Sequence, residues 1–164
     1  MKALLSTVIL LTLASNGWAS DQIERMAVDT FQTFDASELD WQAEAILPPG
    51  AESVLLVGDP GKADVFIVLL KFPPNYPIPA HTHPFTEVLT VLKGDIEHGL
   101  GKTLNKERSE TLQAGDSFVL PADHAHYLWT NDEETIVQLI ATGPWDITYT
   151  DPADDPRNKS ELTD

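Results

Sequence analysis

Short apolar runs alternate with turn-forming residues over most of the chain, from about residue 41 to residue 149. The runs are rich in Val, Ile, Leu, Thr and aromatic residues, and Gly, Pro, Asp and Asn separate them at a spacing of roughly ten residues. In order, they are AEAIL, SVLLVG, DVFIVLLKF, EVLTVLKG, DIEHGLG, SFVLP, HYLWT and TIVQLIAT. Several are apolar on both faces, as in strands buried between two layers. The pattern predicts an all-β sandwich or barrel.

A helical pattern precedes this region. Within residues 20–40, apolar side chains recur at a spacing near 3.6 residues, which predicts a short helix followed by a linker. The positions of the apolar stripe are Ile23, Met26, Ala27, Thr30, Phe31 and Phe34. Residues 41–150 then form the β domain. The polar, Pro-containing residues 151–164 form a tail that we expect to be poorly ordered beyond about Arg157.

The first residues have the pattern of a signal peptide. Lys2 precedes an apolar run over residues 3–14, which is shorter than the about 20 residues needed to span a bilayer. The small residues Gly17 and Ala19 then predict cleavage after Ala19. An uncleaved N-terminal anchor is the alternative. With residues 1–19 removed, we expect a periplasmic or secreted protein.

The net charge of the chain limits the classes of molecule that it is expected to bind. There are 26 Asp and Glu residues against 10 Lys and Arg residues, which gives a net charge of −16. This charge repels nucleic acid backbones and anionic membranes, so we expect neither as a partner after signal cleavage. The simplest interpretation of the charge is solubility. There are no cysteines, which excludes disulfides, thiolate nucleophiles and cysteine-ligated zinc.

The stretch HTHPFTEVLTVLKG, residues 81–94, places polar side chains beside an apolar run. His81 and His83 are two residues apart, so on an extended strand they share a face, and Glu87 has the same parity. We expect all three at one end of a strand whose remainder is core. A divalent cation would compensate three buried polar groups together, and imidazole and carboxylate are normal ligands for transition metals. An exposed pair of histidines remains the alternative on these residues alone.

A second segment, GDSFVLPADHAH over residues 115–126, resembles the second motif of the cupin superfamily. The residues from His81 to Gly94 resemble the first motif. The resemblance extends over roughly Ala45 to Tyr149 and implies a double-stranded β-helix, or jelly roll, with one metal inside the barrel. Carried over by position, it implies four ligands: His81, His83, Glu87 and His126.

The sequence differs from the cupin motifs at two glycine positions, and other segments resemble one particular group of cupins. Asp123 and Asn75 stand where the superfamily has glycines, which affects the shape of the loops but supplies no ligand. The segments LPPGAESVLLVGDP, KFPPNYPIPAHTHP and GPWDITYTDPADDPR resemble a group of small secreted bacterial single-domain cupins whose reaction is unassigned.

Two other histidines are candidates for catalytic roles. His124 has the same parity as His126 and competes with it, although the position of His126 after Pro121 favours His126 as the ligand. His98 shares parity with Ile96, so it is predicted to line the pocket if Ile96 is core. Either His98 or His124 is a candidate general acid or base, or a partner of a ligand. A surface role for His124 and a structural role for His98 are the alternatives.

Three functions fit this site. The first is a metal-dependent enzyme that acts on a small oxygenated substrate by dioxygenase, isomerase, decarboxylase or lyase chemistry. The second is non-catalytic binding of a small sugar or carboxylate, and the third is a purely structural metal. The resemblance favours iron or manganese, with zinc and nickel as further candidates. The amphipathic helix and apolar edge strands also predict a homodimer.

Overall fold

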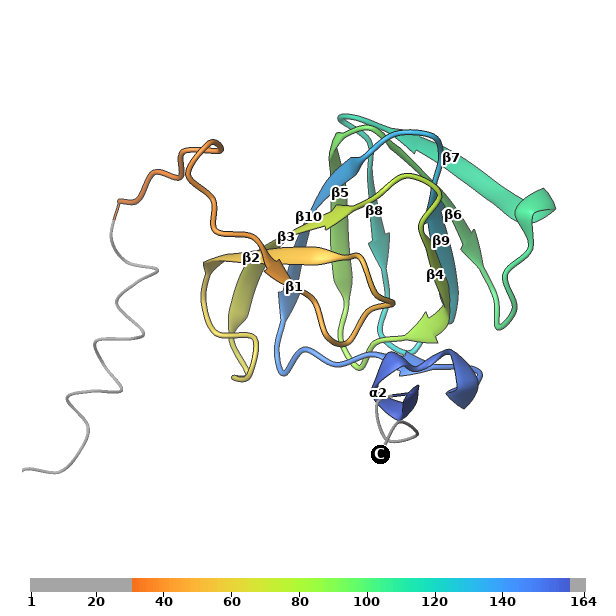
Figure 1. Ribbon diagram of the computed structural model, residues 1–164. Helices are drawn as coiled ribbons and strands as arrows, with labels where there is room; N and C mark the ends of the chain where they lie inside the picture. The colour runs from red at the N-terminus through yellow and green to blue at the C-terminus, as the bar shows by residue number, and fades with distance from the viewer. Residues whose placement is uncertain (1–30, 160–164) are drawn as a thin grey trace, which may run out of the picture. The chain divides into compact units, whose positions relative to one another are not determined.

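The computed structural model describes residues 31–159 of the 164-residue chain. This part of the chain is almost entirely β-structure (Figure 1). Its strands are β1 (Gln42–Ala43), β2 (Glu52–Val57), β3 (Val65–Phe72), β4 (Pro77–Thr82), β5 (Glu87–Lys93), β6 (Asp95–Leu100), β7 (Ser109–Gln113), β8 (Ser117–Leu120), β9 (His126–Thr130), β10 (Thr135–Thr142) and β11 (Thr148–Tyr149). The prediction of an all-β fold is confirmed.

Two antiparallel sheets face each other across the core (Figure 1). Sheet A has the strand order β1-β2-β3-β10-β5-β8, and sheet B has the order β11-β4-β9-β6-β7. From β3 to β11 the chain changes sheet at every connection except the one between β6 and β7. This arrangement is a jelly roll, as predicted. Because the chain crosses so often, residues close in sequence come to lie on facing walls of the barrel.

The core fills the space between the sheets. On β3, alternate side chains from Phe66 to Phe72 are buried and face inward, as the two-residue period of a strand requires. Val137 and Leu139 of β10 occupy the same face, because β10 pairs with β3 in direct register. The outcome is an apolar interior into which only a few polar side chains are built.

Three strands were not predicted from the sequence: β4, β7 and the two-residue β11. Strand β4 contains Pro77 and Pro79, and proline within a run argues against a strand because it removes a backbone donor. Strand β7 is an edge strand with no buried residue, so it lacks an apolar signal. The run AEAIL is wrong as a strand beyond Ala43, because the chain turns from residue 45 onward.

The N-terminal predictions lie mostly outside the described residues. Residues 1–19 and the greater part of the predicted helix belong to the undescribed segment, and residues 31–34 have no helical assignment. The helices that the structure does describe are η2 (Lys106–Arg108), η3 (Pro152–Asp154) and α2 (Pro156–Lys159). None of them is long and apolar enough to cross a membrane.

The outer face of sheet A carries an apolar row across five strands. Direct register aligns five apolar residues that face away from the core: Val57, Ile67, Ile140, Val88 and Val119. All five are at least partly exposed, and Val119 is 65% exposed. A two-fold axis would bring this row against its own copy. The homodimer stays a prediction, which a dimeric mass by light scattering would support and a monomeric mass at micromolar concentration would contradict.

Candidate metal centre

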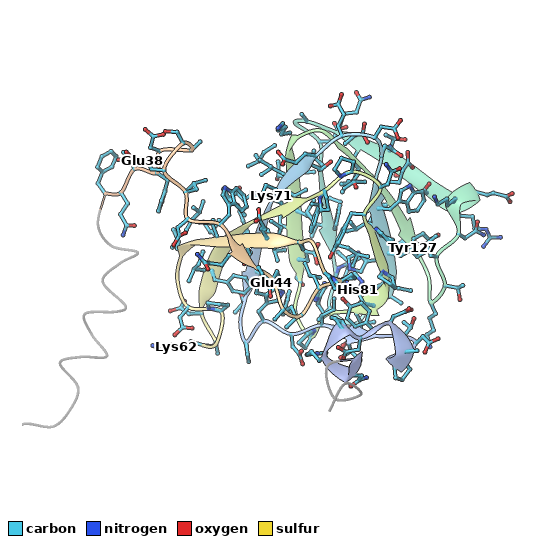
Figure 2. All side chains as sticks on the ribbon, in the orientation of Figure 1. Glu38, Glu44, Lys62, Lys71, His81 and Tyr127 are labelled. Atoms are coloured by element: carbon cyan, nitrogen blue, oxygen red, sulfur yellow. The ribbon has the colours of Figure 1, made fainter. Side chains whose placement is uncertain are left out.

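The first motif crosses from one sheet to the other instead of following one strand. His81 lies on β4 in sheet B, His83 lies in the turn that follows, and Glu87 begins β5 in sheet A. The prediction that all three share one extended strand is therefore wrong. They still converge, because the four-residue crossing brings both strand ends to the same end of the barrel, where all three are buried. Figure 2 labels His81 between the two sheets.

The second motif brings His126 to the same place through strand pairing. Strand β9 pairs with β4 so that His126 is directly opposite His81, and the two ring centroids are 4.2 Å apart. The His83 ring lies 4.8 Å from His81 and 5.5 Å from His126. One ring nitrogen from each histidine lies within 4.8 Å of the other two. The three histidines form a group able to hold a metal ion.

Backbone carbonyls fix the orientation of two of these rings. The His81 Nδ1–H donates to the Pro79 carbonyl oxygen at 2.7 Å, and the His83 Nδ1–H donates to the Asp146 carbonyl oxygen at 2.8 Å. A carbonyl oxygen only accepts, so each Nδ1 carries a hydrogen, and in the neutral ring the lone pair is on Nε2. Metal-ligating histidines commonly make this contact.

The third ring, that of His126, is oriented by a contact with another histidine, His98. His126 Nδ1 lies 3.2 Å from His98 Nε2, whereas His126 Nε2 is buried without a hydrogen-bond partner among residues 31–159. A buried polar atom without a partner is costly unless something else binds it. The donor set therefore fits a metal ion, which would bind the lone pair of His126 Nε2.

Glu87, the fourth predicted ligand, lies beside this group of histidines. Its Oε2 lies 3.1 Å from His83 Nε2, and both side chains are buried. This contact is a hydrogen bond when His83 is protonated on both nitrogens, which the raised pKa of His83 favours. One carboxylate and three imidazoles form a mixed oxygen and nitrogen set, which suits transition metals such as zinc, iron, manganese or nickel.

Burial and neighbouring charges separate the protonation states of these histidines. Burial and, to a smaller extent, the nearby His83 lower the pKa of His81 to about 3. Burial, together with the other histidines, also lowers the pKa of His126 strongly. Burial alone would lower the pKa of His83, but its hydrogen bond to Glu87 and the charge of that carboxylate raise it overall. His81 and His126 are therefore neutral near pH 7, as metal ligands must be.

A small cavity of about 30 Å³ adjoins the four residues. Most of its walls are apolar side chains of the core, among them Ile78, Leu128 and Leu139. Trp145 also lines it, and the Trp145 Nε1–H is the other buried side-chain group without a hydrogen-bond partner in residues 31–159. The cavity therefore has mainly apolar walls, and one of its lining residues has a buried donor without a partner.

The two histidines predicted to be catalytic have different surroundings. His98 is half-buried on β6, its ring stacks on Phe118 at 4.3 Å, and its Nε2 contacts His126. It does not line the cavity, so it lies behind His126. His124 is exposed, and its Nδ1–H donates to the Ala122 carbonyl oxygen at 3.0 Å. The structure brings His98 to the cluster and leaves His124 outside it.

Sequence reasoning missed the contribution of the segment after β10. Trp145 supplies the donor in the cavity, and the carbonyl of Asp146 orients His83. These residues are far from both motifs along the chain, and a backbone carbonyl leaves no sequence signal. The only cue was the aromatic residue in the sequence GPWD, residues 143–146.

Comparison with protein families supports the cupin assignment. Residues 68–143 match the profile of the cupin domain family. Germin-like protein subfamily 2 member 4 of Arabidopsis thaliana is 35% identical over 78 residues, which covers 47% of this chain and 36% of the relative. Germin-like protein 9-3 of Oryza sativa subsp. japonica is 34% identical over 80 residues, 48% of this chain and 37% of the relative. The match thus spans about a third of each relative. These relatives are plant proteins, not members of the bacterial group expected from the sequence.

Solved structures share the fold at low sequence identity. The polyketide cyclase RemF of Streptomyces resistomycificus has a TM-score of 0.62 at 18% identity, covering 82% of this chain and 95% of that one. KdgF of a Halomonas species has a TM-score of 0.56 at 24% identity, covering 69% and 94%. At these identities the likeness concerns the fold alone. The family match and the fold together support placing the chain in the cupin superfamily.

Proposed function

We propose that His81, His83, Glu87 and His126 bind one divalent transition metal ion. Iron or manganese is favoured, and zinc or nickel also suits the donor set. The observation that carries the proposal is the buried His126 Nε2, which has no hydrogen-bond partner in the described part of the chain. One nitrogen of that ring lies within 4.8 Å of one ring nitrogen each of His81 and His83. An ion there would satisfy that atom and replace the contact between His83 and Glu87.

The function that this site supports best is a metal-dependent enzyme for a small oxygenated substrate. Four protein donors leave two positions of an octahedral ion for ligands from solution. A bound ion would act as a Lewis acid or activate water or oxygen. Dioxygenase, isomerase, decarboxylase and lyase reactions remain the candidate classes.

The residues around the ligands have separable tasks. The apolar walls exclude water and strengthen electrostatic interactions inside the cavity. The Trp145 Nε1–H donates a hydrogen bond to an oxygen of the bound ligand. His98 Nε2 accepts a hydrogen bond from the His126 Nδ1–H, which keeps the His126 lone pair on Nε2. His98 is thus a positioning residue that acts through His126.

The size of the cavity limits the kind of ligand that can reach the metal without movement of the surrounding side chains. A volume of about 30 Å³ is close to the share of one water molecule in liquid water. Non-catalytic binding of a sugar would require the surrounding side chains to move, so the cavity favours a ligand with few atoms at the metal. A purely structural metal differs in a measurable way, because its coordination would be closed to small ligands.

Azide binding to cobalt-loaded protein tests this function. Cobalt(II) suits the same donor set, and its visible absorption changes when a ligand enters its coordination sphere. We expect azide to shift the spectrum with saturation. The variant Trp145→Phe, which keeps an aromatic ring but removes the donor, should bind azide several-fold more weakly. A spectrum that azide leaves unchanged would contradict an accessible metal and favour the structural alternative.

The proposal extends to location. The predicted signal peptide places the mature protein outside the cytoplasm, in the periplasm or secreted. N-terminal sequencing of the exported protein would test this, with Ser20 as the expected first residue. Retention of residues 1–19 would contradict it.

A further inference from the structure

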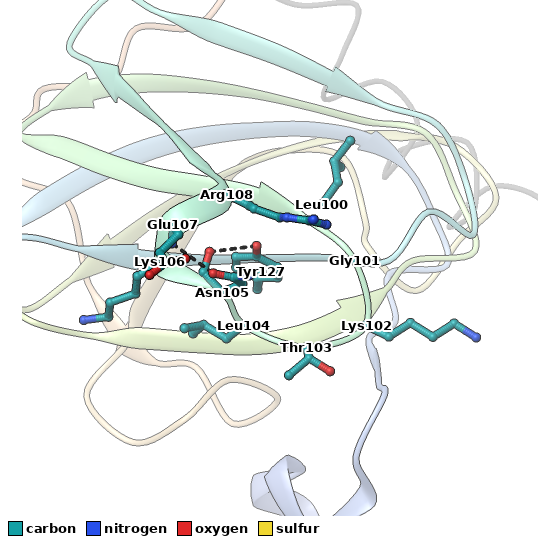
Figure 3. Close-up of a pocket in the computed structure, with 10 residues that line it drawn as sticks. All are labelled: Leu100, Gly101, Lys102, Thr103, Leu104, Asn105, Lys106, Glu107, Arg108 and Tyr127. Carbon is teal, nitrogen blue, oxygen red and sulfur yellow. Dashed lines mark hydrogen bonds between the residues drawn. The ribbon is translucent and has the colours of Figure 1, made fainter.

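The loop between β6 and β7 borders a second hollow, which is open to solvent and distinct from the metal cavity. Its volume is about 730 Å³, within the range of small-molecule sites. It is lined by Leu100, Gly101, Lys102, Thr103, Leu104, Asn105, Lys106, Glu107, Arg108 and Tyr127 (Figure 3). None of these residues lines the metal cavity. Tyr127 follows His126 on β9, so its side chain points to the opposite face of sheet B.

Among the basic side chains that the structure describes, those without an ion pair all line this hollow. The structure describes seven basic side chains, at positions 62, 71, 93, 102, 106, 108 and 157. Four of them form ion pairs: Lys62 with Asp59, Lys71 with Glu52, Lys93 with Glu134, and Arg157 with Asp146 and Asp155. The other three form none within residues 31–159, and all three line the hollow.

This concentration is unusual in an acidic chain. With 26 acidic residues against 10 basic ones, carboxylates are available over most of the surface. The lining has three basic side chains and one acidic side chain, Glu107, which gives it a formal charge of +2. Three exposed cations within seven residues repel one another, and a bound anion offsets that repulsion.

Two of the three cations are free to bind an anion directly. The Lys106 ammonium lies over the Trp129 ring, 5.3 Å from its centroid. In Figure 3, Arg108 extends along the hollow toward Leu100, whereas Lys102 and Lys106 extend from opposite sides of it. A guanidinium binds carboxylate or phosphate with two parallel hydrogen bonds. Arg108 is therefore the side chain best suited to contact an anion, whereas Lys102 extends outward and adds positive charge.

The apolar part of the lining defines the rest of the ligand. Leu100 is 62% exposed, and Leu104 packs beside the outer cluster that contains Tyr127. Exposed leucine next to unpaired cations suits a molecule with an apolar body and an anionic group. We propose that this hollow binds a small organic anion, with its carboxylate or phosphate on Arg108 and Lys102 and its apolar body against Leu100 and Leu104.

Calorimetric titration with phenyl phosphate and with benzoate tests the proposal on the full-length protein. Saturable binding of either aromatic anion is expected, and the better of the two identifies the preferred anionic group. Benzyl alcohol, which lacks the charge, and inorganic phosphate, which lacks the apolar body, should each bind at least tenfold more weakly. Absence of binding by both aromatic anions would overturn the proposal.

Two variants with the same change in charge locate the site. Combining Lys102→Gln, Lys106→Gln and Arg108→Gln should weaken binding at least tenfold. Combining Lys62→Gln, Lys71→Gln and Lys93→Gln should change it less than twofold. Equal weakening in both triple variants would show that only the net charge of the protein matters, and it would overturn the proposal. The single variant Arg108→Gln gives the same answer should the triple variant fold poorly, with several-fold weakening expected.

A third variant separates this hollow from the metal centre. In His81→Ala/His83→Ala protein, binding of the aromatic anion should persist unchanged. Loss of binding there, with retention in Arg108→Gln, would assign the anion to the metal centre and overturn the proposal. The expected binding of the aromatic anion does not depend on whether the metal centre has the proposed function.

Discussion

His126 has two ring nitrogens with different surroundings, and this difference underlies the proposed chemistry. Its Nδ1 contacts His98, and its Nε2 is buried without a hydrogen-bond partner in the described part of the chain. Burial lowers the pKa of His98, so that ring is neutral near pH 7 and can accept the hydrogen from His126 Nδ1. One histidine thus fixes the tautomer of another.

Replacing His98 should weaken metal binding without removing a ligand. In His98→Phe, His126 loses the acceptor that fixes its tautomer, so we expect metal affinity to fall by about 10- to 100-fold. Competition with a chelator of known affinity measures this change. The matched control is His124→Phe, because His124 is exposed and outside the cluster, and its affinity should stay within twofold of wild type. An equal effect of both substitutions would contradict the role of His98.

At the scale of elements, turns set how the strands meet at the site. Gly94 joins β5 to β6 with a positive φ of 73°. A Cβ at this position would lie 2.7 Å from the Thr135 Oγ1 and 2.8 Å from the Glu134 carbonyl oxygen. The glycine therefore serves two requirements, a left-handed backbone and a close approach to the start of β10.

The variant Gly94→Ala should destabilise the fold more than a matched glycine replacement. Gly115 also has a positive φ, of 100°, but a Cβ there meets nothing within 4 Å. We expect a loss of about 1 kcal/mol in the free energy of unfolding for Gly115→Ala, from backbone conformation alone. Gly94→Ala should lose at least about 2 kcal/mol, because the clash adds to that strain. Urea unfolding measures both, and equal losses would contradict the role of the close approach.

The two motifs carried most of what the sequence could predict about the site. Asn75 and Asp123, which replace glycines of the cupin pattern, adopt positive φ values of 57° and 63°. These residue types tolerate that region, so the loops keep their shape despite the substitutions. The Asp123 N–H also donates to the His83 carbonyl oxygen at 2.8 Å and thereby links the two motif loops.

Other features could not be predicted because their signals are not local. The parity of His81 and Glu87 suggested one strand, whereas these residues lie on different sheets. Tertiary pairing allowed β4 to form despite its two prolines. Trp145 reaches the cavity from a segment without a motif. In each case long-range packing decides the structure, and single-sequence patterns do not record it.

At the scale of the whole molecule, an apolar barrel encloses several histidines, and this makes stability depend on pH. The pKa values of His81, His98 and His126 are lowered by burial, so these rings bind protons in the unfolded chain at a pH where the folded chain does not. The pKa of His83 is raised, so it binds a proton in both states below pH 6.5. Below that pH, acid therefore favours unfolding.

Metal-free protein should lose stability as the pH falls from 6.5 to 5. Each proton taken up only on unfolding changes the free energy of unfolding by about 1.4 kcal/mol per pH unit. Urea unfolding of chelator-treated protein measures the slope. The variant His126→Phe should reduce this slope by about one proton. A stability that is flat between pH 6.5 and 5 would contradict the burial of neutral histidines.

The most direct test of the central claim is the metal content of the purified protein. Elemental analysis of wild type should find about one transition metal ion per chain, held by the four proposed ligands. The variant His81→Ala/His83→Ala should contain essentially none, while His124→Ala should retain the wild-type content. Stoichiometric metal in the double variant would contradict the site.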